Sequence, residues 1–168
     1  MPAAEERCGG RGLRMALFVG TVSNKVDKKG RVSVPASFRA ELSGASNAGI
    51  YVFPSYKFPS LEACDHDFMA RLSSGLESLA LFSEQQDDLA ATIFADARLL
   101  SFDGEGRIVL PDPFMAHAGI VGQAAFVGQG PRFQIWKPEA LDAHKATARN
   151  RAREQQMTVP LGPLGGGR

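Results

Sequence analysis

A duplicated stretch of twelve residues restricts the possible folds of this chain more than any other feature of its sequence. Residues 27–38 read DKKGRVSVPASF, and residues 103–114, 76 positions further on, read DGEGRIVLPDPF. Five positions are identical in register, whereas unrelated segments of ordinary composition would share roughly one in twelve. The chain is therefore predicted to consist of two related halves.

Each copy predicts a tight turn, then a strand, then a short helix. In the first copy, Asp27 and Gly30 occupy the first and fourth positions that a type I turn favours. Apolar and polar residues alternate from Arg31, which is the period of a half-buried strand, and Pro35 ends this strand and can open a helix. Because an apolar strand also precedes the turn, we expect residues 17–35 to form a hairpin.

The second copy predicts the same elements. Asp112 is expected to cap its short helix, and Gly119 is expected at the exit. Outside the two copies we expect strands at 50–53, 97–102, 124–127 and 132–136, and a last helix at 138–156 with Leu141 and Ala148 packed inward. On this pattern the second half has one strand more than the first.

A helical insert is predicted between the two copies. From Ser60 as far as Gly75, the apolar residues recur on one helical stripe, formed by Leu61, Cys64, Phe68 and Leu72. Ser83 and Gln86 have the spacing of a capping box and predict a second helix that ends near residue 95.

The chain is accordingly divided into six segments. They are an N-terminal extension expected to be disordered at 1–14, the first repeat at 15–58, the helical insert at 59–96, the second repeat at 97–137, the C-terminal helix at 138–156 and a flexible tail at 157–168. Translation from Met1 and translation from Met15 are both compatible with the sequence.

The composition is that of an ordinary globular protein and indicates no cofactor. The 168 residues are 44% hydrophobic and 22% charged, with no apolar run near the roughly 20 residues that span a bilayer and no signal-peptide pattern, so we expect a cytoplasmic protein. Cys8 and Cys64 are too few for a disulfide framework, and they supply no usual zinc-ligand spacing. We expect no metal and no small-molecule substrate.

The two copies differ in charge. Residues 25–39 carry a net charge of +4, whereas the matching residues 101–115 carry −2. By this count the first copy alone has the positive charge expected of a phosphate-binding surface.

The duplicated motif resembles the two halves of the MraZ family, transcriptional regulators of the bacterial division and cell-wall gene cluster. The shared pattern is Asp-x-x-Gly-Arg-[Val/Ile]-x-[Val/Leu]-Pro followed by a helix with an inward Phe, and residues 125–128 and 132–136 resemble the final hairpin of the family. The resemblance covers about residues 15–150. It implies an α+β fold of the AbrB superfamily, in which two swapped-hairpin halves form a pseudo-two-fold β-barrel with peripheral helices.

The resemblance also implies a function and a site. It implies a repressor that assembles into rings in the cytoplasm, associates with the nucleoid and binds direct repeats in promoter DNA. The Asp-x-x-x-Arg motif of the family falls on Asp27 and Arg31 and on Asp103 and Arg107. Around the first pair, the charge pattern adds Lys25, Lys28 and Lys29 as phosphate contacts. Gly104 and Glu105 replace two of these lysines in the second copy, so its contact with DNA stays open.

Other interpretations compete with DNA binding. Arg31 could simply pair with Asp27 to rigidify the turn, and a ring protein without specific DNA binding could use the same fold. The helix residues Arg149, Arg151 and Arg153 fit a solvated helix end. An enzyme is disfavoured, because the candidate acid and base groups at 65–67 and 83–84 have no nucleophile, phosphate loop or metal-ligand spacing beside them.

Overall fold

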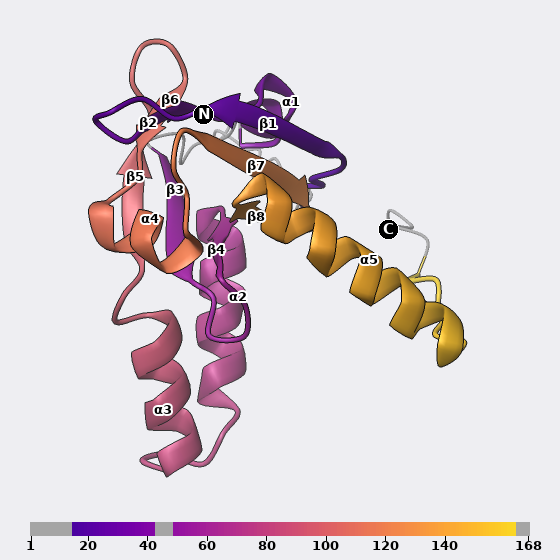
Figure 1. Cartoon of the computed structure of the whole chain (residues 1–168). Coiled ribbons are helices and arrows are strands. Elements are labelled where there is room, and N and C mark those ends of the chain that lie inside the picture. Colours follow the sequence, from indigo (N-terminus) through magenta and orange to yellow (C-terminus); the bar gives the residue numbers. More distant parts are fainter. Residues whose placement is uncertain (1–14, 43–48, 164–168) are drawn as a thin grey trace, which may run out of the picture.

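The computed structural model describes residues 15–42 and 49–163 (Figure 1). The expectations placed on residues 1–14 and on the last five residues of the tail therefore lie outside the described residues.

The described chain forms a six-stranded antiparallel sheet, a separate two-stranded ribbon and five helices. The strands are β1 (Thr21–Lys25), β2 (Arg31–Ser33), β3 (Gly49–Pro54), β4 (Ser60–Cys64), β5 (Arg98–Ser101), β6 (Arg107–Val109), β7 (Gln123–Gly128) and β8 (Phe133–Trp136). The helices are α1 (Ala36–Glu41), α2 (His66–Glu77), α3 (Glu84–Ile93), α4 (Asp112–Ala118) and α5 (Pro138–Glu154). The expected α+β class is confirmed.

Every strand has a partner in the other half, while β3–β4 and β7–β8 also pair within their own halves. The sheet order is β1-β7-β8-β4-β3-β5, and β2 pairs with β6 in the ribbon. Exchanging every strand for its counterpart in the other half (β1 for β5, β3 for β7, β4 for β8) returns the same order in reverse. The duplication in the sequence is therefore also a duplication in space.

The predicted hairpin at 17–35 is present at its turn but wrong in the pairing of its strands. β1 and β2 do flank the turn, but β1 pairs with β7 and β2 pairs with β6, and the two are joined by the bridge between Val26 and Val32. The alternation of apolar residues identifies a strand without identifying its partner. In a duplicated chain, pairing within a half and pairing between halves satisfy the same alternation.

The helix predicted from Ser60 is also wrong at its start, because Ser60–Cys64 is the strand β4 between β3 and β8. Leu61 and Ala63 are fully buried in the core, so pairing on both sides overrides the helical spacing. Helix α2 begins at His66, where the Asp65 carboxylate accepts a hydrogen bond from the backbone N–H of Phe68, and it continues through Gly75 to Glu77. With β4, the first half has the strand that the sequence analysis missed.

The remaining helices lie close to their predicted positions. Ser83 caps α3 as expected, and Gly119 ends α4 with a positive φ of 63°. The residue that precedes α4 is Pro111, so the expected cap at Asp112 is wrong. In α5, Leu141 is buried as predicted, but Ala148 is exposed, because the helix leaves the sheet after its first turns (Figure 1).

The core fixes which face of the ribbon points outward. Phe18 and Phe38 pack edge to face at 5.4 Å, beside Phe133. Val32 and Ile108 are buried in the same cluster, on the inner face of the ribbon. The alternate residues of β2 and β6 therefore point away from the core, at the end of the molecule opposite the α2–α3 hairpin (Figure 1).

Candidate nucleic-acid interface

The first turn holds Arg31 in a fixed orientation. One Asp27 carboxylate oxygen, Oδ1, accepts hydrogen bonds from the backbone N–H groups of Lys29 and Arg31, each at 2.9 Å. The other, Oδ2, accepts from Arg31 Nε at 2.6 Å. Gly30 completes the turn with a φ of 80°, a conformation that few other residues adopt. The aspartate thus organises both the backbone of the turn and the arginine side chain.

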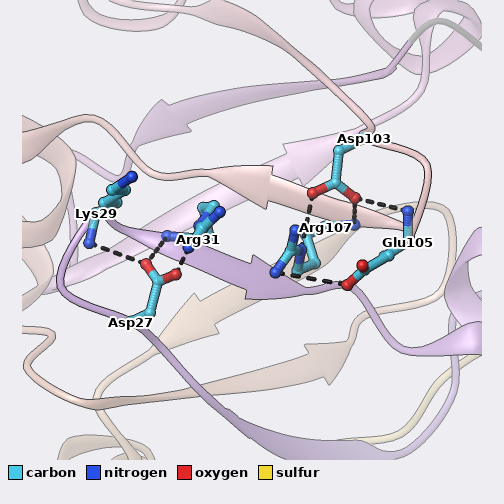
Figure 2. Close-up of polar contacts among 6 residues, drawn as sticks. All are labelled: Asp27, Lys29, Arg31, Asp103, Glu105 and Arg107. Atoms are coloured by element: carbon cyan, nitrogen blue, oxygen red, sulfur yellow. Dashed lines mark hydrogen bonds and ion pairs between the residues drawn. The ribbon is translucent and has the colours of Figure 1, made fainter.

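The second turn repeats this arrangement. Asp103 accepts from the N–H groups of Glu105 and Arg107 at 2.9 Å and from Arg107 Nε at 2.8 Å (Figure 2). It has one additional contact, an ion pair of 3.5 Å between Glu105 Oε2 and Arg107 Nη1. The two copies therefore share the geometry of the motif. They differ in that Arg107 has a second carboxylate partner and, among the described residues, Arg31 does not.

These contacts keep both motifs charged. Hydrogen bonds from the backbone and side chain of Arg31 lower the pKa of Asp27, and those from Arg107 lower the pKa of Asp103. The hydrogen bond to Asp103 raises the pKa of Arg107 further above its ordinary value. The aspartate of each turn is therefore ionised at neutral pH.

The register of the ribbon brings the two motifs onto one surface. Arg31 lies opposite Val109, and Ser33 lies opposite Arg107, so these four side chains share the outward face. Figure 2 shows the two arginines of this set. Arg31 and Arg107 are diagonal neighbours on this face, a relation that puts two residues about 7–8 Å apart. We call the four residues the ribbon face. Two motifs that are 76 positions apart in the sequence therefore lie on one surface.

The guanidinium groups differ in the donors that they leave for a ligand. Within the described part of the chain, Arg31 is held through Nε, and neither of its Nη atoms has a hydrogen bond or ion pair. Arg107 is held through Nε and shares Nη1 with Glu105. A fork of two Nη donors is the geometry that binds phosphate or a guanine edge, and Arg31 presents it more freely.

Arg39 is a residue of the first copy that reaches the turn of the second copy, which the sequence analysis did not foresee. Its Nε donates to the carbonyl of Val34 at 3.1 Å, and its guanidinium lies against Gly106 in the second turn. Its counterpart in the second half is Met115, whose sulfur lies beside Gly30 in the first turn. One positive charge of residues 25–39, that of Arg39, therefore lies beside the second copy, whose own net charge is −2. The sequence would have indicated this contact if the two copies, which are offset by 76 residues, had been expected to pair with each other through β2 and β6.

The three lysines predicted to bind phosphate lie at and near the first turn. Lys25 ends β1, Lys28 and Lys29 are in the turn itself, and all three are exposed. They surround Arg31 with positive charge at one end of the ribbon face. Glu105 is the corresponding exposed residue in the second turn.

The other candidate groups have structural roles. Asp65 and Ser83 cap α2 and α3. Cys64 is buried, and this burial raises the pKa of its thiol to about 12. Across residues 15–42 and 49–163, no three His, Cys, Asp or Glu side chains gather where they could hold a metal ion, and no helix combines the length and the apolar character needed to cross a bilayer.

Comparison with known proteins identifies relatives over most of the chain. A family model described as "MraZ protein, putative antitoxin-like" matches residues 17–51 and 93–159. A "Transcriptional regulator MraZ" of Pelagibacter ubique is 46% identical over 136 residues, which cover 81% of this chain and 88% of the relative. Proteins with the same name from Gluconacetobacter diazotrophicus and Rickettsia bellii are 43% and 44% identical, covering 87% and 82% of this chain and 93% and 92% of the relatives.

Proposed function

The chain belongs to the MraZ family of transcriptional regulators, and from this premise we propose that it binds promoter DNA in a sequence-specific manner through the ribbon face. It acts as a transcriptional regulator, not as an enzyme. In our proposal its targets are direct repeats upstream of the division and cell-wall gene cluster, which it represses.

The observation that carries the proposal is the pair of oriented arginines on one exposed two-stranded ribbon. The major groove of B-DNA admits such a ribbon, and arginine pairs in a bidentate manner with the O6 and N7 atoms of guanine. A separation of about 7–8 Å between diagonal neighbours corresponds to roughly two base-pair steps of 3.4 Å. Asp27 and Asp103 hold the arginines ready, which lowers the entropy lost when they bind.

The exposed cations around the ribbon face supply the affinity that does not depend on sequence. Lys25, Lys28 and Lys29 flank Arg31, and Arg39 lies at the second turn. Their contacts with phosphate would release counterions, so the affinity should fall by about 0.9 log units per phosphate neutralised and per tenfold increase in salt. Asp27 and Asp103 serve to orient, not to contact DNA directly.

We further propose that the two halves form a swapped-hairpin barrel and that several copies assemble into a ring. Two contacts between the ribbon and β1 support this proposal: the Val26–Val32 bridge and a hydrogen bond of 2.7 Å from Asn24 Nδ2 to the Ser33 carbonyl. β1 and β5 are the edges of the six-stranded sheet. Exposed edges of this kind can pair with another chain.

The division into segments is also a proposal, and β4 changes one of its limits. We place β4 (Ser60–Cys64) in the first repeat, so the helical insert starts at Asp65. The other five segments keep their predicted order. A location in the cytoplasm at the nucleoid follows from the proposed binding to chromosomal DNA.

A gel-shift series on DNA from upstream of the protein's own operon tests the proposal. Arg31→Ala should abolish binding that is specific for the repeats, because it removes the free guanidinium fork. Lys28→Ala should weaken binding to every sequence and make the dependence on salt shallower. Arg71→Ala, an exposed arginine on α2, is the matched control and should bind like the parent.

Two outcomes would contradict the proposal. The ribbon face would be the wrong site if Arg31→Ala bound the repeats as tightly as the parent. The alternative of a scaffold protein would be favoured if the parent formed large assemblies but showed no preference for repeats over unrelated DNA.

A further inference from the structure

The ribbon face is asymmetric at one pair of equivalent positions. Val109 is 53% exposed and lies opposite Arg31, whereas its counterpart Ser33 lies opposite Arg107. Its neighbours Ile108 and Leu110 are buried, so the strand holds Val109 outward with no freedom to turn into the core. An apolar side chain thus lies between two cationic ones on the surface proposed to meet DNA.

Backbone hydrogen bonds define how close Val109 comes to Arg31. The Leu110 N–H donates to the Gly30 carbonyl at 2.9 Å, and the Val34 N–H donates to the Gly106 carbonyl at 3.1 Å. Hydrogen-bonded and non-hydrogen-bonded pairs alternate along an antiparallel ribbon, so Arg31–Val109 and Ser33–Arg107 are non-hydrogen-bonded pairs. The side chains of such pairs approach most closely, with Cβ atoms about 4.5–5.5 Å apart.

Resting on the proposed function, we infer that Val109 recognises the C5-methyl group of a thymine next to the guanine read by Arg31. That methyl is the apolar group of the major groove, and arginine and a small apolar side chain are typical readers of guanine and thymine. A separation of about 5 Å between the two side chains is comparable to one or two base-pair steps. Ser33 offers a hydroxyl instead, and this group discriminates poorly between bases.

The inference gives the binding site a direction. A ribbon with identical residues at equivalent positions would read a DNA site equally well in both orientations. Val109 opposite Arg31 and Ser33 opposite Arg107 distinguish one end from the other, as do Lys29 and Glu105 in the two turns. This asymmetry is what reading repeats in a single orientation requires.

Replacement of single thymines by deoxyuridine tests the inference, because it removes the methyl and keeps the base pair. Burial of one methyl is worth about 0.8 kcal/mol, which corresponds to about fourfold in affinity per repeat. The parent should lose this factor at one thymine in each repeat. Val109→Ser should bind the thymine site about fourfold more weakly and should no longer distinguish thymine from uracil.

Two further variants sharpen the design. Ser33→Val should create a new preference for thymine beside the guanine read by Arg107. Leu81→Ser, at the tip between α2 and α3 and 73% exposed, is the matched control and should keep the discrimination of the parent. Size exclusion with light scattering should give Val109→Ser the same mass as the parent.

The outcomes separate the two levels of the proposal. Parent protein that binds the repeats but is indifferent to uracil at every thymine would overturn the inference and leave the proposed function standing. A changed mass for Val109→Ser would assign Val109 to a contact between copies and would also overturn it. Failure of the parent to bind the repeats at all would instead contradict the proposed function.

Discussion

The two arginines of the ribbon face belong to the same motif but differ in how many of their N–H donors are left for a ligand. Asp27 and Asp103 accept a hydrogen bond from the Nε atom of Arg31 and of Arg107, respectively. Glu105 forms an additional ion pair with Nη1 of Arg107. The motif itself could be predicted from the sequence, because a turn and an alternating strand are local features. The neighbourhood of each motif could not, since Arg39 reaches the second turn only because the halves exchange strands.

Removal of the charge on Glu105 should strengthen binding to DNA. Glu105→Gln releases Arg107 Nη1 and removes a negative charge from the surface, so affinity for the repeats should rise about three- to tenfold at low salt, within the range of one ordinary hydrogen bond. Fluorescence anisotropy with labelled repeats measures this. Glu77→Gln, on α2, is the control and should leave affinity unchanged. Weaker binding by Glu105→Gln would mean that Glu105 positions Arg107 productively.

The carboxylates of both turns should make the protein less stable in acid. The pKa values of Asp27 and Asp103 are lower in the folded protein than the ordinary value of 3.8. Their contribution to the free energy of unfolding is thus fully present above pH 3.8 and is lost as the pH falls below it, through the folded pKa. Asp27→Asn with Asp103→Asn should flatten this part of the stability curve, as measured by urea unfolding between pH 2.5 and 6. If the double variant lost stability in acid as steeply as the parent, the two aspartates would not be the cause of that loss.

At the scale of elements, the sequence predicts the strands and helices better than their partners. The alternation at 31–34 and 107–110, the capped start of α3 and the glycine that ends α4 were all recognisable, because each depends on neighbouring residues. β4 was missed because five residues fit a helical and an extended pattern equally well. Which strands pair depends on contacts between halves, and local patterns do not carry that information.

The glycines of the two turns should differ in their tolerance of a side chain. Gly30 and Gly106 both have positive φ, at 80° and 73°, so alanine at either should destabilise the protein by about 1 kcal/mol or more. A Cβ at Gly30 would lie 2.7 Å from the backbone carbonyl of Leu110, whereas a Cβ at Gly106 meets the flexible side chain of Arg39. Gly30→Ala should therefore be the more destabilising change in urea unfolding. If both variants lost the same free energy of unfolding, the positive φ alone would account for the effect, and the contact with the Leu110 carbonyl would add nothing.

On the scale of the whole molecule, the sheet is open and its margins are apolar. Leu17 and Val19, which precede β1, are 60% and 71% exposed, and Leu99 on β5 is 49% exposed. Because β1 and β5 are the two ends of the sheet, a head-to-tail contact between copies would use different surfaces and could close into a ring.

The protein should therefore exceed the mass of one chain in solution. Light scattering coupled to size exclusion should give a multiple of 18.0 kDa, and Leu17→Lys with Val19→Lys should shift it toward the single chain by placing charge at the contact. Leu161→Lys, 98% exposed in the tail, is the control. A parent protein that runs as a stable monomer would contradict the assembly.

The exchange of strands also governs when this chain can fold during its synthesis. Thr21 of β1 pairs with Val127 of β7, so the N-terminal strand has no partner until more than a hundred further residues have been made. At about 5–20 residues per second, β1 waits on the order of 5–20 seconds beside the ribosome with the hydrogen-bonding groups of its backbone unpaired. Folding of the first half is thus tied to completion of the second. A nascent chain truncated before β7 should remain sensitive to protease and should recruit chaperones, whereas the duplicated motif alone would suggest a half that folds by itself.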